Sequence, residues 1–541
     1  MQRVAIIGAG TMGAGIALCA AMADFEVDLV EIDAAIRHRA CERLKRDAAR
    51  AERTDALTRV QLCAAIDEIG AAELAIEAVP EVLELKQRVF LELERKLGDG
   101  AILATNTSSL SVRQIAEVLA APQRALGLHF FNPPVVMKLI EVVQTDDADA
   151  AVIEIGRTFA QALGKTAVIT ADSPGFIVNR VARPYYVQAL RALDAGVGDV
   201  RDLDFLARGT GFRMGPFELM DLIGLDVNLA TTESIYERTE AARFEPVPRQ
   251  QKMVAERKLG RKTGEGFYKY EPGERVTVSP VTAPSAPAPN ADEAVLVLGF
   301  GEFADAVAST LRQTYENVHQ IETDDALDQL DWQPTIVFDL GDGVSDRWAR
   351  LAELERIVSE DTVIFVDAYS TPIRALADRL EKPQRIVGYG IIGSLERQAV
   401  VEIVDADQTD DDALALAEEL FAALGKRTML VADVPALFLG RVVASVVNEA
   451  VYAVQEGVAS VDDIDRAMQL GTNYPAGPIA WGKEIGGERV FRILSQLAAA
   501  EGKAFGPARA LWTLDANAEE LEHAAEEQLR EAERRYNLYS G

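Results

Sequence analysis

The sequence is poor in cysteine, in histidine and in long apolar runs. Its 541 residues include 3 cysteines, which all fall before residue 64, and 4 histidines. So few and unevenly placed cysteines indicate reduced thiols, and they exclude a disulfide framework and a cysteine-rich zinc site; we predict no metal centre. No apolar run approaches the roughly 18 residues that a membrane-spanning helix needs. Because the apolar run Val4–Ile7 is also too short for a signal peptide, we predict a soluble, cytoplasmic protein without a membrane partner.

Positive charge is scarce as well. The chain carries 55 Lys and Arg against 86 Asp and Glu, a net charge of −31. This balance argues against nucleic acid as a partner, because binding it requires a basic surface. Hydrophobic residues make up 49% and charged residues 26%, which is ordinary for a folded protein. At about 150 residues per domain, the length predicts three or four domains.

An internal duplication accounts for this length. Short motifs recur in register: Pro122–Arg124 as Pro383–Arg385, Glu141 as Glu402, Leu163–Lys165 as Leu424–Lys426, Asp172 as Asp433, Pro174 as Pro435 and Arg180 as Arg441, all 261 residues apart. Farther on, Gly209 recurs as Gly471 and Gly215–Pro216 as Gly477–Pro478, with a spacing of 262. Two unrelated domains would not keep such a register, so the chain contains the same unit twice.

Each unit divides into two parts. Short β-rich runs alternate with helical stretches in the first part, at residues 4–7, 27–30, 74–77, 102–104, 125–130, 139–143 and 167–170. This alternation predicts a doubly wound, Rossmann-like parallel sheet. Ser173 as N-cap and Pro174 at the first helical position predict a helix over 174–195, which opens a mostly helical second part. The predicted fold class is therefore α/β plus all-α, with the pair duplicated.

The domain boundaries follow from this division. A proline-rich stretch without amphipathic period, residues 271–292, predicts an extended linker. The predicted plan is a sheet domain at 1–172, a helical domain at 173–270, the linker at 271–292, a second sheet domain at 293–432 and a second helical domain at 433–541.

A glycine-rich loop joins the first strand to the first helix. Gly8 permits a tight turn, Gly10 lets the backbone approach a pyrophosphate, and Gly13 allows close packing of helix on strand. The helix N-terminus, with Thr11 and Met12, would face the phosphates. Glu31 ends the second strand, 18 residues after Gly13, where an acid binds the ribose hydroxyls and repels a 2′-phosphate. The pattern predicts NAD as cofactor rather than NADP, and assigns it to the domain 1–172.

One histidine of the four stands at a position suited to catalysis. His129 ends an apolar strand, and the carboxyl ends of strands face the ligand crevice of a doubly wound sheet. An imidazole there can take a proton from a substrate hydroxyl. Glu141 lies in the next apolar strand, where a carboxylate requires a partner, and His129 is the candidate. The alternatives are a core histidine bonded to a backbone carbonyl and an edge-strand glutamate facing water.

Two further polar groups lie near strand or helix ends. Asn106 and Ser108 follow the strand at 102–104, and Asn179 lies in the predicted helix after Pro174. Their amide and hydroxyl groups could bind substrate oxygens in the crevice. Taken singly, Ser108 could equally cap a helix and Asn179 could equally serve helix packing.

Taken together, the motifs of the first unit resemble the short-chain 3-hydroxyacyl-CoA dehydrogenase family. The resemblance runs from Val4 to Tyr270 and rests on GAGTMGAG at 8–15, ATNTSSL at 104–110, GLHFFNP at 127–133, VMKLIEVV at 136–143, SPGFIVNR at 173–180, MGPFEL at 214–219 and KTGEGFY at 262–268. It implies NAD-dependent oxidation of (S)-3-hydroxyacyl-CoA to 3-ketoacyl-CoA, with a place in fatty acid β-oxidation. The run Arg180–Tyr186 looks like the branch that serves aromatic (phenylacetate) degradation and acts on 3-hydroxyadipyl-CoA.

The resemblance also implies roles for individual residues. The catalytic residues are Ser108, His129, Glu141 and Asn179, and the cofactor contacts are Gly8, Gly10, Thr11, Met12, Gly13, Glu31, Glu81, Lys86, Asn106, Ser108, Asn132 and Lys262. The helical hairpin with which the family grips CoA is shortened here, at residues 37–70. The cations available for the CoA phosphates are Lys45, Arg46, Arg50 and Arg53, which could instead form a solvated helix face.

The second unit has lost most of these groups. At the 261-residue offset Ser108 becomes Tyr369, His129 becomes Gly390 and Asn179 becomes Gly440, while the glycine loop carries Glu302. We predict no hydride transfer there. Because the family dimerises through its helical domain, we predict that the two helical domains pair within one chain as an internal pseudo-dimer, in a monomer or a homodimer.

Three functions compete. The first is an active dehydrogenase of 3-hydroxyacyl-CoA, supported by four intact catalytic positions in the first unit. The second is a catalytically silent relative kept for binding or structure, which the decay of the second unit allows. The third is a dehydrogenase of free hydroxy acids, against which the motif at 173–180 argues.

Overall fold

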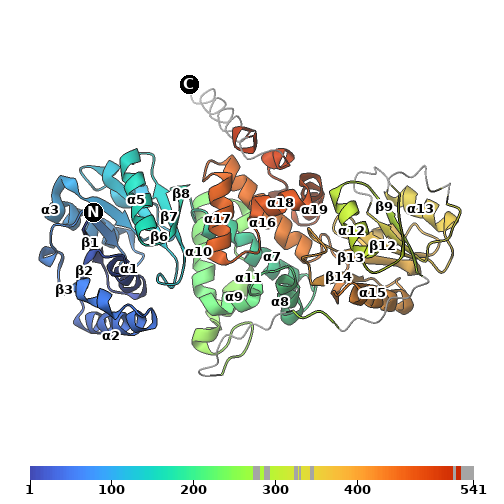
Figure 1. Cartoon of the computed structure of the whole chain (residues 1–541), viewed down its shortest axis with the longest axis horizontal. Helices are drawn as coiled ribbons and strands as arrows, with labels where there is room; N and C mark the ends of the chain where they lie inside the picture. Colours follow the sequence, from blue (N-terminus) through green and yellow to red (C-terminus); the bar gives the residue numbers. More distant parts are fainter. Residues whose placement is uncertain are drawn as a thin grey trace.

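A computed structural model describes residues 1–271, 281–284, 293–321, 327, 330–340, 347–515 and 520–524 (Figure 1). The proline-rich linker expected at 271–292 lies mostly outside these residues. The elongated molecule has one sheet domain at each end and helices from both copies between them (Figure 1). In the part of the chain that is described, no helix combines the length and the apolar character needed to cross a membrane.

The first sheet has eight strands in the order β3-β2-β1-β4-β5-β6-β7-β8. They are β1 (Arg3–Ile7), β2 (Glu26–Val30), β3 (Val60–Cys63), β4 (Leu74–Glu77), β5 (Ile102–Thr105), β6 (Ala125–Phe130), β7 (Leu139–Gln144) and β8 (Thr166–Ala171). The expectation of an all-parallel sheet needs one correction, because β6 and β7 are antiparallel. The short connection between them leaves no room for a crossover helix. The edge strand β3 was not predicted from the sequence, because two of its four side chains are exposed and it contains no apolar run.

Helices cover both faces of this sheet. They are α1 (Thr11–Met22), α2 (Ala34–Arg50), α3 (Leu83–Leu97), α4 (Val112–Ala116) and α5 (Ala150–Ala162). Along β1, Val4 and Ile6 join a core with α1, α2 and α5, whereas Ala5 and Ile7 join a core with α3 and α4. This alternation is the period of a strand buried on both faces.

The first helix of the first helical domain begins later than the sequence predicts. The domain consists of α6 (Val178–Val181), α7 (Arg183–Asp194), α8 (Val200–Gly209), α9 (Pro216–Ile223), α10 (Leu225–Thr239) and α11 (Pro248–Ala255). The expected helix over 174–195 is wrong in two respects: it starts at Val178, and it is interrupted at Ala182. Gly175 and Phe176 have φ of 80° and 49°, which is incompatible with an α-helix, so Ser173 is not its N-cap.

The second copy repeats this plan with a smaller sheet. Its seven described strands have the order β10-β9-β11-β12-β13-β14-β15, with β14 antiparallel to β13. The strands are β9 (Ala294–Leu298), β10 (Asn317–Ile321), β11 (Ile336–Asp339), β12 (Val363–Asp367), β13 (Ile386–Gly390), β14 (Val400–Asp405) and β15 (Arg427–Ala432). The helices are α12 (Glu302–Arg312), α13 (Arg347–Ile357), α14 (Ile373–Ala377), α15 (Asp411–Ala423), α16 (Leu439–Gln455), α17 (Val461–Thr472), α18 (Pro478–Ile485) and α19 (Gly487–Glu501).

The two copies pack against each other in a reciprocal manner. Helix α7 of the first copy lies along α16 of the second. At the end of β8, the Ala171 N–H donates to the Val458 carbonyl at 2.8 Å, and at the end of β15 the Ala432 N–H donates to the Val197 carbonyl at 3.1 Å. Each residue in one bond is 261 positions from its counterpart in the other. Each sheet domain therefore contacts the helical domain of the opposite copy, as in a two-fold interface.

Candidate active site

A buried imidazole–carboxylate pair lies between β6 and β7. The antiparallel register places His129 opposite Glu141, and His129 Nδ1 lies 2.6 Å from Glu141 Oε2. Both side chains are buried, with residue exposures of 6% and 0%. The imidazole ring packs between the rings of Phe131 and Phe176, at centroid distances of 4.6 Å and 5.6 Å. The carboxylate holds the proton on Nδ1, which leaves Nε2 as the basic nitrogen of the neutral ring.

The Glu141 carboxylate also binds the backbone where the first helix of the helical domain begins. Glu141 Oε1 accepts hydrogen bonds from the backbone N–H groups of Ile177 at 3.0 Å and Val178 at 2.8 Å. It satisfies the first amides of α6 in place of the N-cap that the sequence suggested. One side chain thus fixes both the histidine and the start of the helix that carries Asn179.

Ser108 and Asn179 lie next to each other across the domain boundary. Asn179 Nδ2 donates to the Ser108 carbonyl oxygen at 3.4 Å, and both residues are half-buried. Asn106 has a different task, because its Oδ1 accepts from the Phe130 N–H at 2.9 Å and so joins the end of β5 to the end of β6. The structure therefore brings together the loop after β5 and the start of α6.

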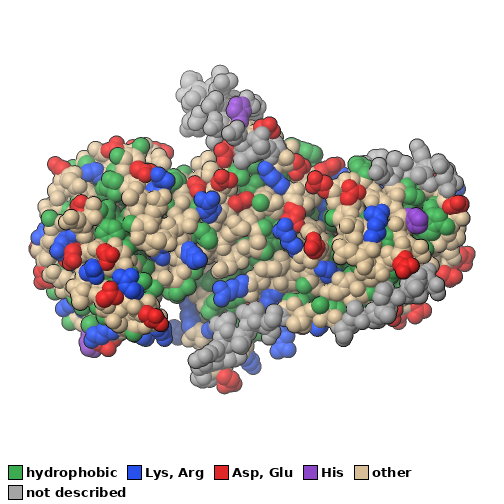
Figure 2. Space-filling model, viewed as in Figure 1, with side chains coloured by type: hydrophobic (Ala, Val, Ile, Leu, Met, Phe, Trp, Pro, Cys, Tyr) green, Lys and Arg blue, Asp and Glu red, His purple; other side chains and the backbone are tan. Residues whose placement is uncertain are grey.

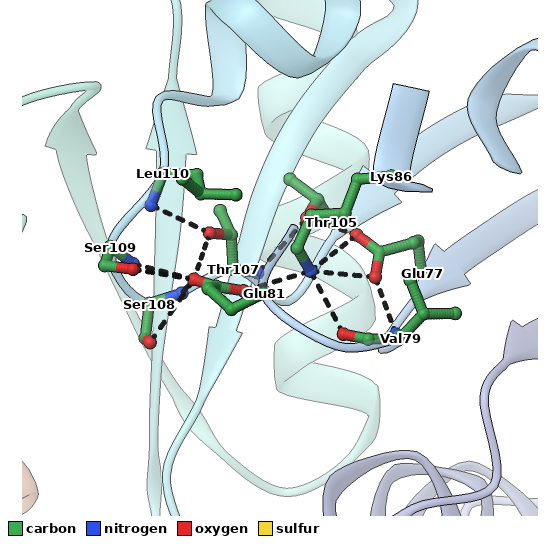
Figure 3. Close-up of polar contacts among 9 residues, drawn as sticks. All are labelled: Glu77, Val79, Glu81, Lys86, Thr105, Thr107, Ser108, Ser109 and Leu110. Atoms are coloured by element: carbon green, nitrogen blue, oxygen red, sulfur yellow. Dashed lines mark hydrogen bonds and ion pairs between the residues drawn. The ribbon is translucent and has the colours of Figure 1, made fainter. Parts of the chain in front are cut away.

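Glu81 organises the loop that carries Ser108 (Figure 3). Its Oε1 accepts from the Thr107 hydroxyl at 2.6 Å and from the N–H groups of Ser108 and Ser109 at 2.9 and 3.0 Å. Burial alone would raise the pKa of Glu81, but the Lys86 charge and these hydrogen bonds lower it to about 2. The sequence marks Thr107 and Ser109 only as small polar residues after the strand at 102–104, and the structure shows that both donate to Glu81.

Lys86, expected at the cofactor, is buried beneath this loop. Its exposure is 1%, and its Nζ lies 2.8 Å from Glu77 Oε1 and 3.1 Å from Glu81 Oε2 (Figure 3). Burial raises the pKa of Glu77, which Lys86 and the Thr105 hydroxyl oppose. In this structure Lys86 neutralises the carboxylates of Glu77 and Glu81, and Glu81 in turn holds the loop that carries Ser108.

The glycine loop has the geometry of a phosphate-binding turn. Gly8 has φ of 101°, and a Cβ on Gly13 would lie 1.8 Å from the Gly8 carbonyl oxygen. A Cβ on Gly10 would meet no described atom within 4 Å, which leaves space beside the start of α1. Glu31 Oε2 accepts from the Ala9 N–H at 3.1 Å and so ties β2 to the loop. These residues fit a dinucleotide, because Gly10 and Thr11 are exposed where α1 begins, and a helix N-terminus attracts phosphate oxygens.

The other candidate contacts lie at the surface. Asn132 is exposed after β6, and Lys262 forms an ion pair with Asp226 of the helical domain. The candidate CoA cations on and after α2 are exposed and pair with nearby acids: Lys45 with Glu42, Arg46 and Arg50 with Asp47, and Arg53 with Asp55. Blue and red side chains accordingly alternate over this end of the molecule (Figure 2).

In the second copy a tyrosine fills the equivalent of the site at His129 and Glu141. Glu402 Oε1 accepts from the N–H groups of Phe438 at 2.8 Å and Leu439 at 3.2 Å, as Glu141 does in the first copy. Its Oε2, however, accepts from the Tyr369 hydroxyl at 2.8 Å. Cβ atoms on Gly390 and Gly440 would approach the Tyr369 ring to 2.8 and 2.6 Å. The tyrosine that replaces Ser108 therefore occupies the space that the missing His and Asn side chains would need.

An arginine joins the helical domain of the second copy to its sheet domain. Arg489 on α19 donates to the Ile391 carbonyl at 2.7 Å, lies 3.2 Å from Asp367 Oδ2, and stacks 3.9 Å from the ring centroid of Phe303 at the start of α12. It thereby joins the helical domain to the loop region where a dinucleotide would bind. The counterpart of Arg489 in the first copy is Val227, which is 50% exposed.

Comparisons with known proteins agree with both the fold and the duplication. The family described as "3-hydroxyacyl-CoA dehydrogenase, NAD binding domain" matches residues 3–173 and 295–434, and the family's C-terminal domain matches 175–270 and 438–530. The chain is 37% identical to the 3-hydroxyadipyl-CoA dehydrogenase of Escherichia coli K12 over 512 residues, which cover 92% of this chain and 94% of that protein.

Two further relatives extend this comparison. The crystal structure of 3-hydroxybutyryl-CoA dehydrogenase from Escherichia coli K12 superposes with a TM-score of 0.76 at 35% identity, covering 95% of this chain and 98% of the other. The human mitochondrial hydroxyacyl-coenzyme A dehydrogenase is 38% identical over 289 residues, which cover 50% of this chain and 92% of that protein.

Proposed function

From the premise that this chain belongs to the NAD-dependent 3-hydroxyacyl-CoA dehydrogenase family, we propose that its first copy oxidises (S)-3-hydroxyacyl-CoA to 3-ketoacyl-CoA, with His129 as the general base. The observation that carries the proposal is the 2.6 Å contact between His129 Nδ1 and Glu141. It leaves Nε2 to take the proton of the 3-hydroxyl group, and Glu141 stabilises the imidazolium that forms.

Ser108 and Asn179 position the substrate in this proposal. They meet where the loop after β5 contacts the start of α6, so their polar groups reach the same space from two domains. Holding the hydroxyl-bearing carbon next to His129 supplies much of the rate enhancement, because the proton then moves between groups already in place. Glu81 keeps the Ser108 loop in position through its hydrogen bonds to Thr107, Ser108 and Ser109.

The cofactor site is proposed at the glycine loop. Gly8, Gly10, Thr11, Met12 and Gly13 would hold the pyrophosphate, and Glu31 would hold the adenosine ribose. NAD supplies the hydride acceptor when it is bound. Asn106, Ser108, Glu81, Lys86, Asn132 and Lys262 remain proposed contacts or supports of this site. Lys45, Arg46, Arg50 and Arg53 are proposed for the CoA phosphates, in competition with their acidic neighbours.

The second copy serves the first in this proposal. Tyr369 occupies the space that the equivalents of His129 and Asn179 would need, and Arg489 contacts Phe303 at the start of α12, so we assign the second copy no hydride transfer. Its helical domain packs on the first as an internal pseudo-dimer, through contacts such as α7 with α16.

The test is formation of NADH from (S)-3-hydroxybutyryl-CoA and NAD. His129→Gln should lower kcat by about 10³-fold or more, because the general base is lost. Glu141→Gln should also lower kcat by about 10³-fold, because its amide would favour a proton on Nε2 and the wrong tautomer. His319→Gln, at an exposed position in the second copy, is the matched control.

Two results would contradict the proposal. A wild-type protein that binds NAD but oxidises no 3-hydroxyacyl-CoA would favour the catalytically silent alternative. Turnover of free 3-hydroxy acids, without turnover of their CoA thioesters, would favour the third function considered from the sequence.

A further inference from the structure

A guanidinium without an anionic partner is buried one helical turn beyond Asn179. Arg183 is 4% exposed. Its Nε donates to the Asn179 carbonyl at 2.7 Å, and its Nη1 lies 3.2 Å from both the Asn228 carbonyl and the Thr232 hydroxyl. These partners are all neutral, and among the described residues no carboxylate forms an ion pair with Arg183. A buried cation without a counter-ion is costly.

The neighbouring Arg180 shows what is missing. It is equally buried, but Glu449 and Glu456 of the second copy each lie 2.7 Å from its guanidinium. Of the two buried arginines in this segment, Arg180 therefore has carboxylate partners within the described chain and Arg183 has none. The missing anion at Arg183 would have to come from a ligand.

Two more hydrogen-bond donors near Arg183 have no acceptor. Asn228 Nδ2 and the Tyr474 hydroxyl are both buried, and within the described part of the chain neither has a hydrogen-bond partner. The backbone carbonyl of Asn228 accepts from Arg183, while its side-chain Oδ1 accepts from the Gln250 amide. The Tyr474 ring lies 5.9 Å, centroid to centroid, from the ring of Tyr185, which follows Arg183 by two residues, so the second copy brings this side chain to the same segment. Donors without acceptors fit an acceptor-only ligand such as a carboxylate.

The location relates these donors to the substrate. Arg183 follows Asn179 by four residues, a rise of about 6 Å along a helix. In a six-carbon dicarboxyl chain, three carbon–carbon bonds of about 1.5 Å each separate the hydroxyl-bearing carbon from the distal carboxylate. A hydroxyl group held beside Asn179 thus puts that carboxylate within reach of Arg183.

We propose that Arg183, Asn228 and Tyr474 form a site for the distal carboxylate of the acyl chain and make the enzyme selective for dicarboxyl-CoA substrates. The proposal rests on the proposed function, because it places the site at the far end of the same substrate. Tyr474 belongs to the second copy, so the copy without catalytic groups completes the substrate site of the first.

A purely structural role for Arg183 makes a different prediction. Its side chain also lies over the Tyr186 ring, at 4.8 Å from the centroid, and it joins α7 to α10. If that cross-link were its whole role, replacing it would lower the stability of the protein and affect every substrate alike.

The experiment compares two substrates of equal chain length in the full-length protein. Reduction of 3-oxoadipyl-CoA and of 3-oxohexanoyl-CoA by NADH is measured, and the ratio of their kcat/KM values gives the selectivity. Arg183→Met should lower kcat/KM for the adipyl substrate by about 100-fold and leave that for the hexanoyl substrate within about 3-fold. Arg191→Met is the matched control, since Arg191 lies two turns on in α7 and pairs with Glu501.

Tyr474→Phe isolates the proposed contact without removing a charge. It deletes one hydroxyl that has no partner in the free protein, so the melting temperature should stay constant or rise. The kcat/KM for the adipyl substrate should nevertheless fall by about 10-fold, with that for the hexanoyl substrate unchanged. Tyr185→Phe is the control, because its hydroxyl already donates to the Met214 carbonyl.

The outcomes separate this inference from the proposed function. No reduction of either substrate by the wild type would overturn the proposed function. Reduction of both with equal kcat/KM, or a loss in Tyr474→Phe that is the same for both, would overturn the carboxylate site alone. If Arg183→Met fails to fold, the ratio of kcat/KM for the adipyl and hexanoyl substrates in Tyr474→Phe still tests the carboxylate site.

Discussion

Glu141 and Glu402 show how one buried carboxylate can have two roles. Each accepts hydrogen bonds from two successive N–H groups where a helix begins, and each is 0% exposed. The alternative of an edge-strand glutamate facing water is therefore wrong for Glu141. The helix contact is common to both copies, whereas the histidine partner occurs in the first alone. This explains why the second copy keeps the glutamate after losing the histidine.

The environment of Glu402 gives stability a pH dependence. Burial raises the pKa of Glu402 from its ordinary value of 4.5 to about 7, so the folded chain binds a proton at pH values between 4.5 and 7 that the unfolded chain releases. The stabilisation is present in full below about pH 4.5 and is lost as the pH rises through 7. Glu402→Gln mimics the protonated carboxyl. We expect its stability to differ little from that of the wild type at pH 5 and to exceed it at high pH, by on the order of 3 kcal/mol.

Thermal unfolding of both proteins from pH 5 to pH 9 checks this expectation. Two parallel curves of melting temperature against pH would contradict it. NADH formation should be the same in Glu402→Gln as in the wild type, since Glu402 lies in the second copy.

At the scale of elements, the sequence predicts strands better than helix ends. Seven of the eight strands of the first sheet, such as β1 and β6, are marked by β-rich runs that depend on local sequence. The start of α6 is set by Glu141, which is more than thirty residues earlier and on another element. A local N-cap pattern at Ser173 could not reveal this. The antiparallel direction of β7 likewise depends on the length of the connection and not on the strand sequence.

Because β12, β13 and α16 pack around Tyr369, the effects of substitutions at Gly440 and Tyr369 on stability should depend on each other. A Cβ on Gly440 would lie 2.6 Å from the Tyr369 ring, so Gly440→Ala should destabilise the protein by about 1 to 3 kcal/mol. In a Tyr369→Ala background the same substitution should cost almost nothing, because the ring is gone.

A double-mutant cycle by chemical denaturation measures this coupling. Additive effects of Gly440→Ala and Tyr369→Ala would show that the ring does not occupy the vacated site. The sequence alone shows that three candidate catalytic positions changed, but the mutual fit of tyrosine with two glycines requires the structure.

For the whole molecule, the duplication could be predicted from the spacing of the repeats, but the asymmetry of the interface could not. The two copies exchange equivalent backbone hydrogen bonds, from Ala171 and from Ala432. Their ion pairs differ, however: Arg180 pairs with Glu449, while its counterpart Arg441 pairs with Glu501. The counterpart of Glu449 is Gln188, which is uncharged and cannot form an ion pair with Arg441.

This asymmetry predicts a strong effect of one residue of the second copy. Glu449 is 1% exposed and holds both Arg180 and Arg243 of the first copy. Glu449→Gln should destabilise the protein by about 3 kcal/mol, because it leaves a buried guanidinium with a weaker partner. It should also lower kcat for the first copy, since Asn179 precedes Arg180.

Thermal unfolding and steady-state kinetics of the same variant test this pair of effects. Glu256→Gln provides the control, since Glu256 is half-exposed and pairs with exposed lysines, where the expected change is below about 1 kcal/mol. An unchanged melting temperature in Glu449→Gln would contradict a supporting role for the second copy.

The reciprocal contacts between the copies have a consequence for dilution. Subunits of a dimer held by such contacts separate when their concentration falls below the dissociation constant, and any group shared across the interface is then lost. Here the partner is part of the same chain, so its local concentration is fixed by the connection and not by the amount of protein. Specific activity should therefore be constant over every enzyme concentration at which the assay can be read.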